Sequence, residues 1–180
     1  MFSRLAIIVV AGVLLSARAH GQVLEEYQVK AAFLYNFAKF VEWPADAFRT
    51  SKDPIVICVL GHNPFGRNLE EVIRGKSIEG RSLDLRQVDQ AQQANACHIL
   101  FVSASDGKQF RTLASSLKPS GMLTVGEVQG FASRGGVVNF KMEDGRVRFE
   151  VNVDVAEHEQ LHISSKLLSL AQIVKTEKAQ

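Results

Sequence analysis

Residues 54–60 read Pro-Ile-Val-Ile-Cys-Val-Leu, a continuous apolar run that starts at a proline and stops before Gly61. A strand that is apolar at every position, rather than at every second one, is typical of a parallel sheet that is covered on both faces. Residues 97–102, Cys-His-Ile-Leu-Phe-Val, form a second run of this kind. The two segments predict a central sheet with a layer of structure on each side.

The rest of the chain alternates between helical and strand patterns. Asp144-Gly145 is a hairpin signal, so part of the sheet is expected to be antiparallel. We expect a single compact α/β domain, a mixed β-sheet flanked by helices, with an aromatic-rich N-terminal helix that ends at Pro44 and a long C-terminal helix. The expected helices are residues 23–43, 67–74, 107–118 and about 154–175, and the further strands are residues 82–88, 121–126, 137–142 and 146–152.

The first nineteen residues have the pattern of a secretory signal peptide. Residues 1–4 carry one positive charge, residues 5–15 are apolar, and Ala17-Arg18-Ala19 is a cleavage pattern. The apolar run is shorter than the roughly 20 residues of a membrane helix, and an uncleaved anchor is the alternative. We expect export through the Sec pathway, cleavage after Ala19, and a mature domain of residues 20–180 that does not itself span the membrane.

The charge balance changes when this segment is removed. The whole chain has 21 Lys+Arg and 19 Asp+Glu. Loss of Arg4 and Arg18 takes the basic count from 21 to 19 and leaves the mature protein formally neutral. Proteins that bind nucleic acid present a basic surface, so nucleic acid is not an expected partner.

The chain has two cysteines, Cys58 and Cys97, and both fall within the apolar runs. In an exported protein, two cysteines favour a disulfide, and a pair of unbonded core cysteines is the alternative. A bridge would close a loop of about 40 residues and contribute roughly 3–4 kcal/mol if unstrained. It also requires the two strands to be neighbours in the sheet.

His158-Glu159-Gln160-Leu161-His162 matches the H-E-x-x-H pattern, in which two histidines on one helix bind zinc and the glutamate acts as a base. On a helical wheel, however, His158 and His162 lie opposite the apolar side, where they would face water. That apolar side is formed by Ile163, Leu167, Leu170, Ala171 and Val174. We favour a solvated helix face, with zinc chemistry as the alternative.

Two polar loops follow the apolar strands. Gly61–Gly66 has the spacing of a phosphate loop, but Arg67 and Asn68 replace the lysine and hydroxyl residue that such a loop uses, so we favour a structural turn. Ser103–Asp106 could orient a ligand, because ligands bind after the strands of α/β sheets, but it serves equally well as a helix N-cap. No nucleophile–base pair can be assembled, so no catalytic residue and no cofactor is assigned.

Aromatic residues are concentrated near the N-terminus of the mature chain. Of fourteen aromatic residues, seven lie between Tyr27 and Phe48. They occupy several sides of the expected helix, so a single sheet face cannot cover them all. Burial between elements of the same chain is one explanation. The other is a partner or dimer interface, in which aromatic anchors supply binding energy, with Phe33, Phe37, Phe40 and Trp43 as its residues.

The segment Val29-Lys-Ala-Ala-Phe-Leu-Tyr-Asn-Phe-Ala-Lys-Phe-Val-Glu-Trp-Pro44 resembles the opening signature of the YfiR family of exported proteins. The resemblance continues in order through nearly the whole mature chain. The further matching segments are Gly61–Gly66, Cys97–Val102, Leu123–Glu127, Gly130-Phe131, Gly135-Gly136, Arg146–Asn152 and Leu161–Ala171.

The resemblance implies a periplasmic regulator with a compact, dimerising α/β domain. Such proteins bind the periplasmic domain of an inner-membrane diguanylate cyclase and repress it, which lowers cyclic-di-GMP and biofilm formation. An OmpA-like outer-membrane lipoprotein can sequester the repressor. Cys58 and Cys97 match a cysteine pair that the family is taken to bridge, whereas a second pair found in some relatives is missing here.

Three functions are therefore compared. The preferred one is a homodimeric repressor that captures its partner through the aromatic helix. The second is a periplasmic small-ligand-binding or sensory module that uses the loops after the strands. The third is a small zinc hydrolase built on His158, Glu159 and His162.

Overall fold

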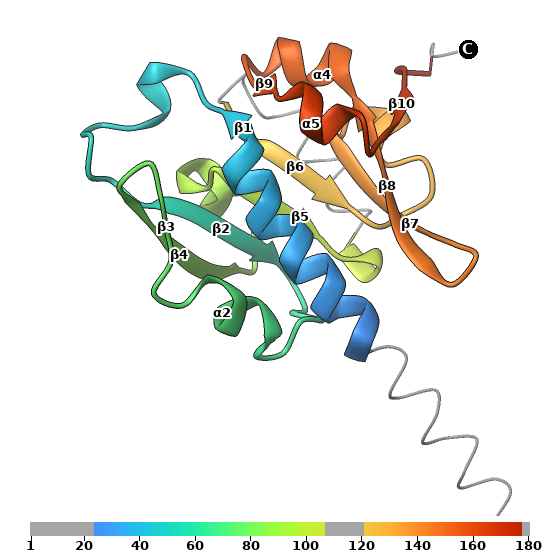
Figure 1. Cartoon of the computed structure of the whole chain (residues 1–180), viewed down its shortest axis with the longest axis horizontal. Coiled ribbons are helices and arrows are strands. Elements are labelled where there is room, and N and C mark those ends of the chain that lie inside the picture. Colours follow the sequence, from blue (N-terminus) through green and yellow to red (C-terminus); the bar gives the residue numbers. More distant parts are fainter. Residues whose placement is uncertain (1–23, 107–120, 178–180) are drawn as a thin grey trace, which may run out of the picture.

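The computed structural model describes residues 24–106 and 121–177 of the chain (Figure 1). The expected signal peptide and the helix expected at residues 107–118 lie outside the described residues. Within these residues, a mixed sheet has eight strands in the order β10-β8-β7-β6-β5-β2-β4-β3. These strands are β2 (Ile55–Leu60), β3 (Ser77–Ile78), β4 (Arg81–Val88), β5 (Ile99–Val102), β6 (Leu123–Gly126), β7 (Val138–Glu143), β8 (Arg146–Asn152) and β10 (Gln172–Val174).

Strand β2 lies inside the sheet and is buried at all six positions. It pairs in parallel with β4 on one side and with β5 on the other, so Cys58 lies beside Leu100. Pairs β5–β6 and β6–β7 are also parallel, whereas β7–β8 and β3–β4 are antiparallel. The mixed α/β fold expected from the apolar runs is confirmed.

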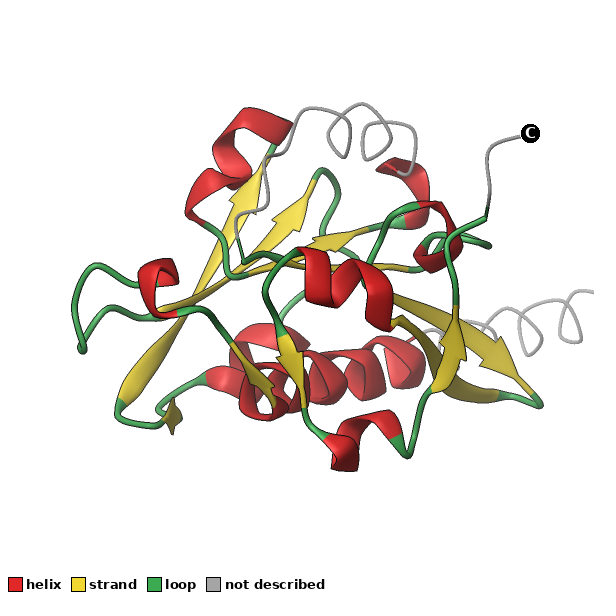
Figure 2. Ribbon diagram, turned by 90° about the horizontal axis from the view of Figure 1, so that it is seen from above, coloured by secondary structure: helices red, strands yellow, loops and turns green. Residues whose placement is uncertain are grey.

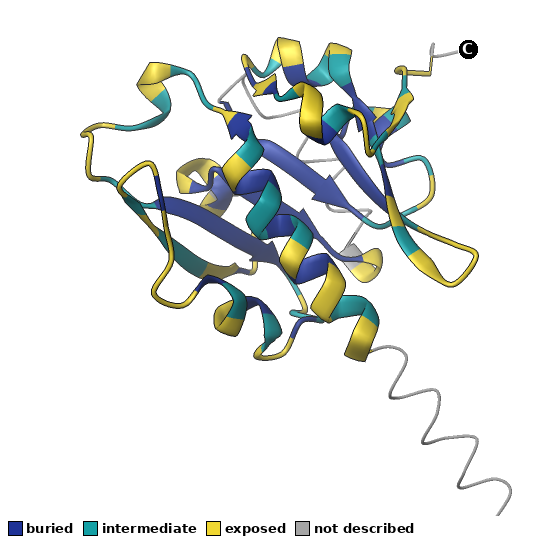
Figure 3. Cartoon of the chain, in the orientation of Figure 1, coloured by how far each residue is buried: buried dark blue, intermediate teal, exposed yellow. Residues whose placement is uncertain are grey.

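One face of the sheet is covered by the N-terminal helix, residues 24–40, with α2 (Asn68–Ile73) and α4 (Val153–His158) on its two sides (Figures 1 and 2). The helix buries Ala31, Leu34, Phe37 and Ala38, which recur at intervals of three or four residues. They pack on the odd-numbered residues of β2 and on the aromatic residues of β7 and β8. Figure 3 shows this dark buried stripe on the side of the helix that meets the sheet.

The opposite face carries a second, smaller apolar cluster. Its strand residues include Val56, Cys58 and Leu60, which alternate with the residues that face the N-terminal helix. The disulfide expected between Cys58 and Cys97 is present, with 5.8 Å between the two Cα atoms. The bridge links Cys58 of β2 to Cys97, which lies just before β5, and so joins the two neighbouring strands covalently.

Phe131 closes the end of this second cluster between two glycines. A Cβ atom added at Gly126 would lie 2.3 Å from the Phe131 ring, and one added at Gly136 would lie 2.2 Å from it. No other residue type fits at either position without displacing the ring. The glycines at these positions are therefore required by the close approach of an aromatic side chain.

The long C-terminal helix expected at residues 154–175 is wrong. Helix α4 ends at His158, and Gln160 adopts a left-handed conformation with φ 58°. The Leu161 amide donates to the Ala156 carbonyl, and the Gln160 amide donates to the Glu157 carbonyl, which together form a Schellman cap. The chain then continues as β9 (His162–Ile163), α5 (Ser165–Leu168) and β10.

Strand pairing explains why the helical periodicity misleads. Strand β9 pairs antiparallel with β1 (Val41–Glu42), so residues 41 and 42 leave the N-terminal helix to make this contact. Ile163 and Leu167 are buried, as the periodic pattern requires, but they belong to two separate short elements, β9 and α5. Leu170, which a continuous helix would place on the apolar side, is 65% exposed.

The disulfide makes a testable contribution to stability. We expect reduction of Cys58–Cys97 to lower the free energy of unfolding by roughly 3–4 kcal/mol, because the bridge restricts the unfolded chain. Urea unfolding with and without a reductant measures the difference. The double variant C58A/C97A serves as the control, since its stability must not respond to the reductant. An equal free energy of unfolding for oxidised and reduced wild-type protein would contradict the expectation.

The turn at Gln160 distinguishes the observed fold from a continuous helix. We expect Gln160→Gly to be more stable than Gln160→Val by about 1 kcal/mol, since a left-handed conformation is strained for any residue with a Cβ. In a helix interior the order is reversed, because glycine is the poorer helix former. Thermal unfolding of the two variants decides between these orders, and greater stability of the valine variant would mean that residues 154–175 form one helix.

Candidate functional site

A groove of about 610 Å³ lies at the C-terminal end of the N-terminal helix. Four separate segments form its walls: the helix end with β1, the loop through the 3₁₀ helix η1 (Ala45–Ala47), the hairpin of β3 and β4, and the start of α5. Its lining residues include Phe40, Trp43, Phe48, Ile78, Arg81 and Ser164.

Backbone pairing brings together two segments that are far apart in the sequence at this groove. Val41 lies opposite Ile163 and Glu42 opposite His162, and the Ser164 amide donates to the Phe40 carbonyl at 3.0 Å. The Ser164 hydroxyl oxygen is buried and makes no hydrogen bond within the described part of the chain.

Two lining residues of the groove, Phe48 and Arg81, belong to a stack of three side chains whose third member, His98, lines a smaller neighbouring cavity. The guanidinium of Arg81 lies 3.7 Å from the centroid of the Phe48 ring, and the other face of Phe48 stacks on His98 with 4.3 Å between centroids. Arg81 Nη1 also donates to the carbonyls of Thr50 and Asp53, at 2.9 Å each. Trp43 meets the His98 ring edge-on and donates from Nε1 to the His98 carbonyl at 3.3 Å.

Two backbone groups, one N–H donor and one carbonyl acceptor, hold His98 as a neutral imidazole. Its Nδ1 accepts from the Val56 amide at 3.0 Å, so Nε2 carries the proton and donates to the Ala47 carbonyl at 3.1 Å. Burial lowers the pKa of His98 below its ordinary value of 6.5, and the positive charges of Arg81 and Arg86 act in the same direction. The bond to Ala47 and the charge of Asp53 oppose this shift.

The loop that carries Phe48 is closed on itself by Asp53. Its carboxylate accepts from the Thr50 hydroxyl at 2.6 Å and from the amides of Arg49 and Thr50. The hydrogen bond from the Thr50 side chain is the main reason that the pKa of Asp53 lies below its ordinary value. The loop therefore forms a compact turn whose contact with the sheet runs through Arg81 and His98.

The structure separates the four aromatic residues that the sequence singles out. Phe37 is completely buried, and Phe33 packs on Phe140 and Phe149. Burial within the same chain thus accounts for both. Phe40 and Trp43 are partly buried and line the groove, so the expected partner surface rests on these two residues.

The two loops weighed as ligand sites meet at the carboxyl ends of β2 and β5. The chain passes from β2 to β4 on one side and returns to β5 on the other, so this edge is the topological switch point at which α/β sheets bind ligands. Here, however, side chains of the protein itself fill the position. Phe65 of the first loop is buried between Tyr27 and Phe101.

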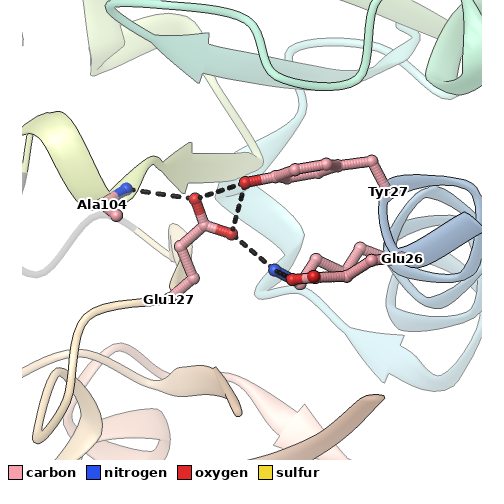
Figure 4. Close-up of polar contacts among 5 residues, drawn as sticks. Glu26, Tyr27, Ala104 and Glu127 are labelled. Carbon is pink, nitrogen blue, oxygen red and sulfur yellow. Dashed lines mark hydrogen bonds and ion pairs between the residues drawn. The ribbon is translucent and has the colours of Figure 1, made fainter. Parts of the chain in front are cut away.

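A buried ion cluster occupies the same edge (Figure 4). Lys30 contacts Glu26 and lies 2.7 Å from Glu127, and the side chains of Lys30 and Glu127 are 4% and 6% exposed. Glu127 also accepts from the Tyr27 hydroxyl at 3.1 Å and from the Ala104 amide at 3.1 Å. Burial and the neighbouring Glu127 charge raise the pKa of Tyr27 above its ordinary value. The cluster fastens the start of the helix across the switch point.

Sequence reasoning missed Lys30, Glu127 and Arg81. A signal for Lys30 was available, because it lies one helical turn before Leu34, on the side of the helix that meets the sheet. No local signal identifies Glu127 or Arg81, since their partners are distant in the sequence. Lys30 and Glu127, for example, are separated by 97 residues.

The H-E-x-x-H residues do not share a helix. His158 is the last residue of α4, and His162 belongs to β9, beyond the left-handed turn at Gln160. Among the residues that the structure describes, no group of three or more His, Cys, Asp and Glu side chains could hold a metal ion. The spacing that motivates the zinc interpretation is therefore not realised as a helical pair.

No helix within residues 24–106 and 121–177 combines the length and the apolar character needed to span a membrane. A family profile described as YfiR/HmsC-like matches residues 27–172. No curated protein matches the sequence.

Among solved structures, the chain is similar to the ABC domain in complex with L-Trp from Streptococcus pneumonia, with 12% identity and a TM-score of 0.48. The alignment covers 66% of this chain and 55% of that one, so the chain spans about half the length of that protein.

Within the ion cluster, the effect of Lys30 on the free energy of unfolding should depend strongly on Glu127. We expect Lys30→Met to lower the free energy of unfolding by about 3–5 kcal/mol, because Glu127 loses its buried counter-charge. Urea unfolding of K30M, E127Q and K30M/E127Q measures the coupling, and the double variant should be more stable than K30M.

The matched control is Lys39→Met, which changes an exposed lysine on the same helix and should alter stability by less than about 0.5 kcal/mol. Strictly additive effects of K30M and E127Q would show that the two side chains do not interact.

Proposed function

Because the chain belongs to the YfiR/HmsC-like family, we propose that it is a periplasmic, non-enzymatic repressor that binds the periplasmic domain of an inner-membrane diguanylate cyclase. Occupation of the cyclase by the repressor lowers cyclic-di-GMP and biofilm formation. The family match supports the broader part of the proposal, a periplasmic regulator of cyclic-di-GMP signalling. The pattern of residues 1–19 supports export through the Sec pathway with cleavage after Ala19.

The groove at Phe40 and Trp43 is the observation that supports a specific binding surface for the partner. Aromatic side chains in a concave, partly desolvated position are typical of the residues that dominate protein–protein binding energy. The groove is also bordered by charges of both signs, from Lys39, Lys166 and Arg81 on one hand and Glu42 and Glu79 on the other. Such a border favours a partner with complementary charges around an apolar anchor.

A small ligand in the same groove is the second candidate. Its volume of about 610 Å³ falls within the range of roughly 300–1,000 Å³ found for ligand pockets. A sensory function would then use the groove rather than the loops after the strands, which the protein fills itself.

The family resemblance adds two further partners to the proposal. A homodimer would be detected by light scattering of the mature protein. An OmpA-like outer-membrane lipoprotein would compete with the cyclase for the same groove, so its soluble domain should displace a bound cyclase domain.

Deletion of the gene tests the proposed function in a strain that contains the cognate cyclase. We expect cyclic-di-GMP to rise on deletion and to return to its original level when the wild-type protein is supplied. Phe40→Ala should fail to restore the low level, because it removes an aromatic anchor from the groove. Mass spectrometry of cell extracts measures the nucleotide.

Met142→Ala is the control, since Met142 is a large apolar residue that is exposed on the β7–β8 hairpin, outside the groove. It should restore repression fully, and both variants should reach the same periplasmic abundance as the wild type. Unchanged cyclic-di-GMP on deletion would refute the repressor function, and full activity of F40A would refute the groove as its binding surface.

A further inference from the structure

We propose that His98 is a pH-sensitive latch, which holds residues 43–53 against the sheet as a neutral imidazole and releases this wall of the groove when it becomes protonated. The proposal concerns the regulation of the groove, so its consequence for a partner rests on the proposed function. The latch itself is a property of the chain alone and is tested without a partner.

The first argument is the pairing of donors and acceptors around the ring. Nδ1 must accept from the Val56 amide of β2, while Nε2 donates to Ala47 in η1. An imidazolium has two donors and no acceptor. Protonation would therefore convert Nδ1 from an acceptor into a donor. Its N–H would then face the Val56 N–H, and two buried donors that face each other are unfavourable in an environment of low polarity.

The second argument is that the His98 ring is one of the attachments of the loop to the sheet, beside Arg81. Phe48 stacks on the imidazole, Ala47 accepts from it, and Trp43 donates to the carbonyl of the same residue. A shift of the ring would disturb the contacts with Phe48 and Ala47, and also the edge contact between the rings of Trp43 and His98. Trp43 and Phe48 are also lining residues of the groove, so the movement would change its shape.

The third argument is the set of charges around the ring. Strand β2 brings no titratable side chain, because its cysteine, Cys58, is disulfide-bonded. Strand β4 and the loop bring charges of both signs. Arg81 and Arg86 disfavour an added positive charge, and Asp53 favours it. The charged residues that approach His98 or line the smaller cavity beside it are Asp46, Arg49, Asp53, Arg81 and Arg86.

The shift in the pKa of His98 determines whether the latch is lost at low or at high pH. Burial and the arginine charges lower the pKa of His98, so the unfolded or released chain binds the proton more strongly than the latched one does. The latch is therefore fully stable above about pH 6.5 and is progressively lost as the pH falls below that value.

The fluorescence of Trp43 can report on the latch. Trp43 is the only tryptophan of the protein, and it contacts the His98 ring. Contact with an imidazolium quenches indole fluorescence, and release of the loop exposes the indole to water. We expect the emission of the mature protein to change in a single one-proton transition with a midpoint below 6.5, while the far-ultraviolet circular dichroism stays constant.

His98→Gln is the decisive variant, because the glutamine amide has one acceptor and one donor but does not titrate in this range. We expect H98Q to lose the fluorescence transition, whereas His158→Gln, at an exposed histidine, should retain it. Persistence of the transition in H98Q, or its absence in the wild-type protein, would overturn the latch. Nitrogen chemical shifts of the His98 ring in the wild-type protein give the same test without a substitution, since a proton on Nδ1 at pH 7.5 would also overturn it.

A second measurement separates the latch from the proposed function. Binding of the purified cyclase periplasmic domain should weaken at least tenfold between pH 7.5 and the acid end of the fluorescence transition in the wild-type protein, and should change less in H98Q. A fluorescence transition without any binding at pH 7.5 would refute the repressor function and leave the latch standing. Binding with equal affinity across the transition would refute the regulatory role of the latch.

Discussion

The burial of strand β2 on both faces is the constraint on which the other features depend. Its odd-numbered residues receive the N-terminal helix, and its even-numbered residues form the opposite cluster and carry the disulfide to Cys97. Its Val56 amide fixes the tautomer of His98, which in turn supports the loop at the groove. A strand with one solvated face could not organise two layers and a loop at the same time.

Much of the fold could be predicted from local patterns, because apolar runs and turn residues act over short distances. The strands at Ile55–Leu60 and Ile99–Val102 and the hairpin at Asp144-Gly145 are examples. The C-terminal segment could not be predicted in this way. Its apolar residues have a helical spacing, but pairing of β9 with β1 and the left-handed turn at Gln160 outweigh that preference.

The candidate site could be predicted only in part, for a related reason. Phe40 and Trp43 are visible in the sequence as members of an aromatic cluster, but the groove also needs Arg81 and Ser164 from distant segments. The same cluster also contains Phe37, whose side chain belongs to the core. The periodicity of one helix cannot separate the aromatic residues that pack inside the chain from those that remain available to a partner.

The proposed function is one of recognition by shape, in which the partner carries out the chemistry. The switch-point edge, where α/β proteins commonly bind ligands, is filled by the ion pair of Lys30 and Glu127 and by Phe65. A concave surface lies at the other end of the N-terminal helix, beside a loop that Arg81 and one neutral histidine attach to the sheet. The proposed partner surface and the proposed proton-sensitive group therefore lie in the same part of the molecule.

Photocrosslinking in living cells tests the central claim most directly. A benzoylphenylalanine introduced in place of Lys166, an exposed residue of the groove, should crosslink to an inner-membrane diguanylate cyclase. The same group in place of Met142 should not. A cyclase crosslink from position 142 and none from position 166 would contradict the assignment of the groove as the partner surface.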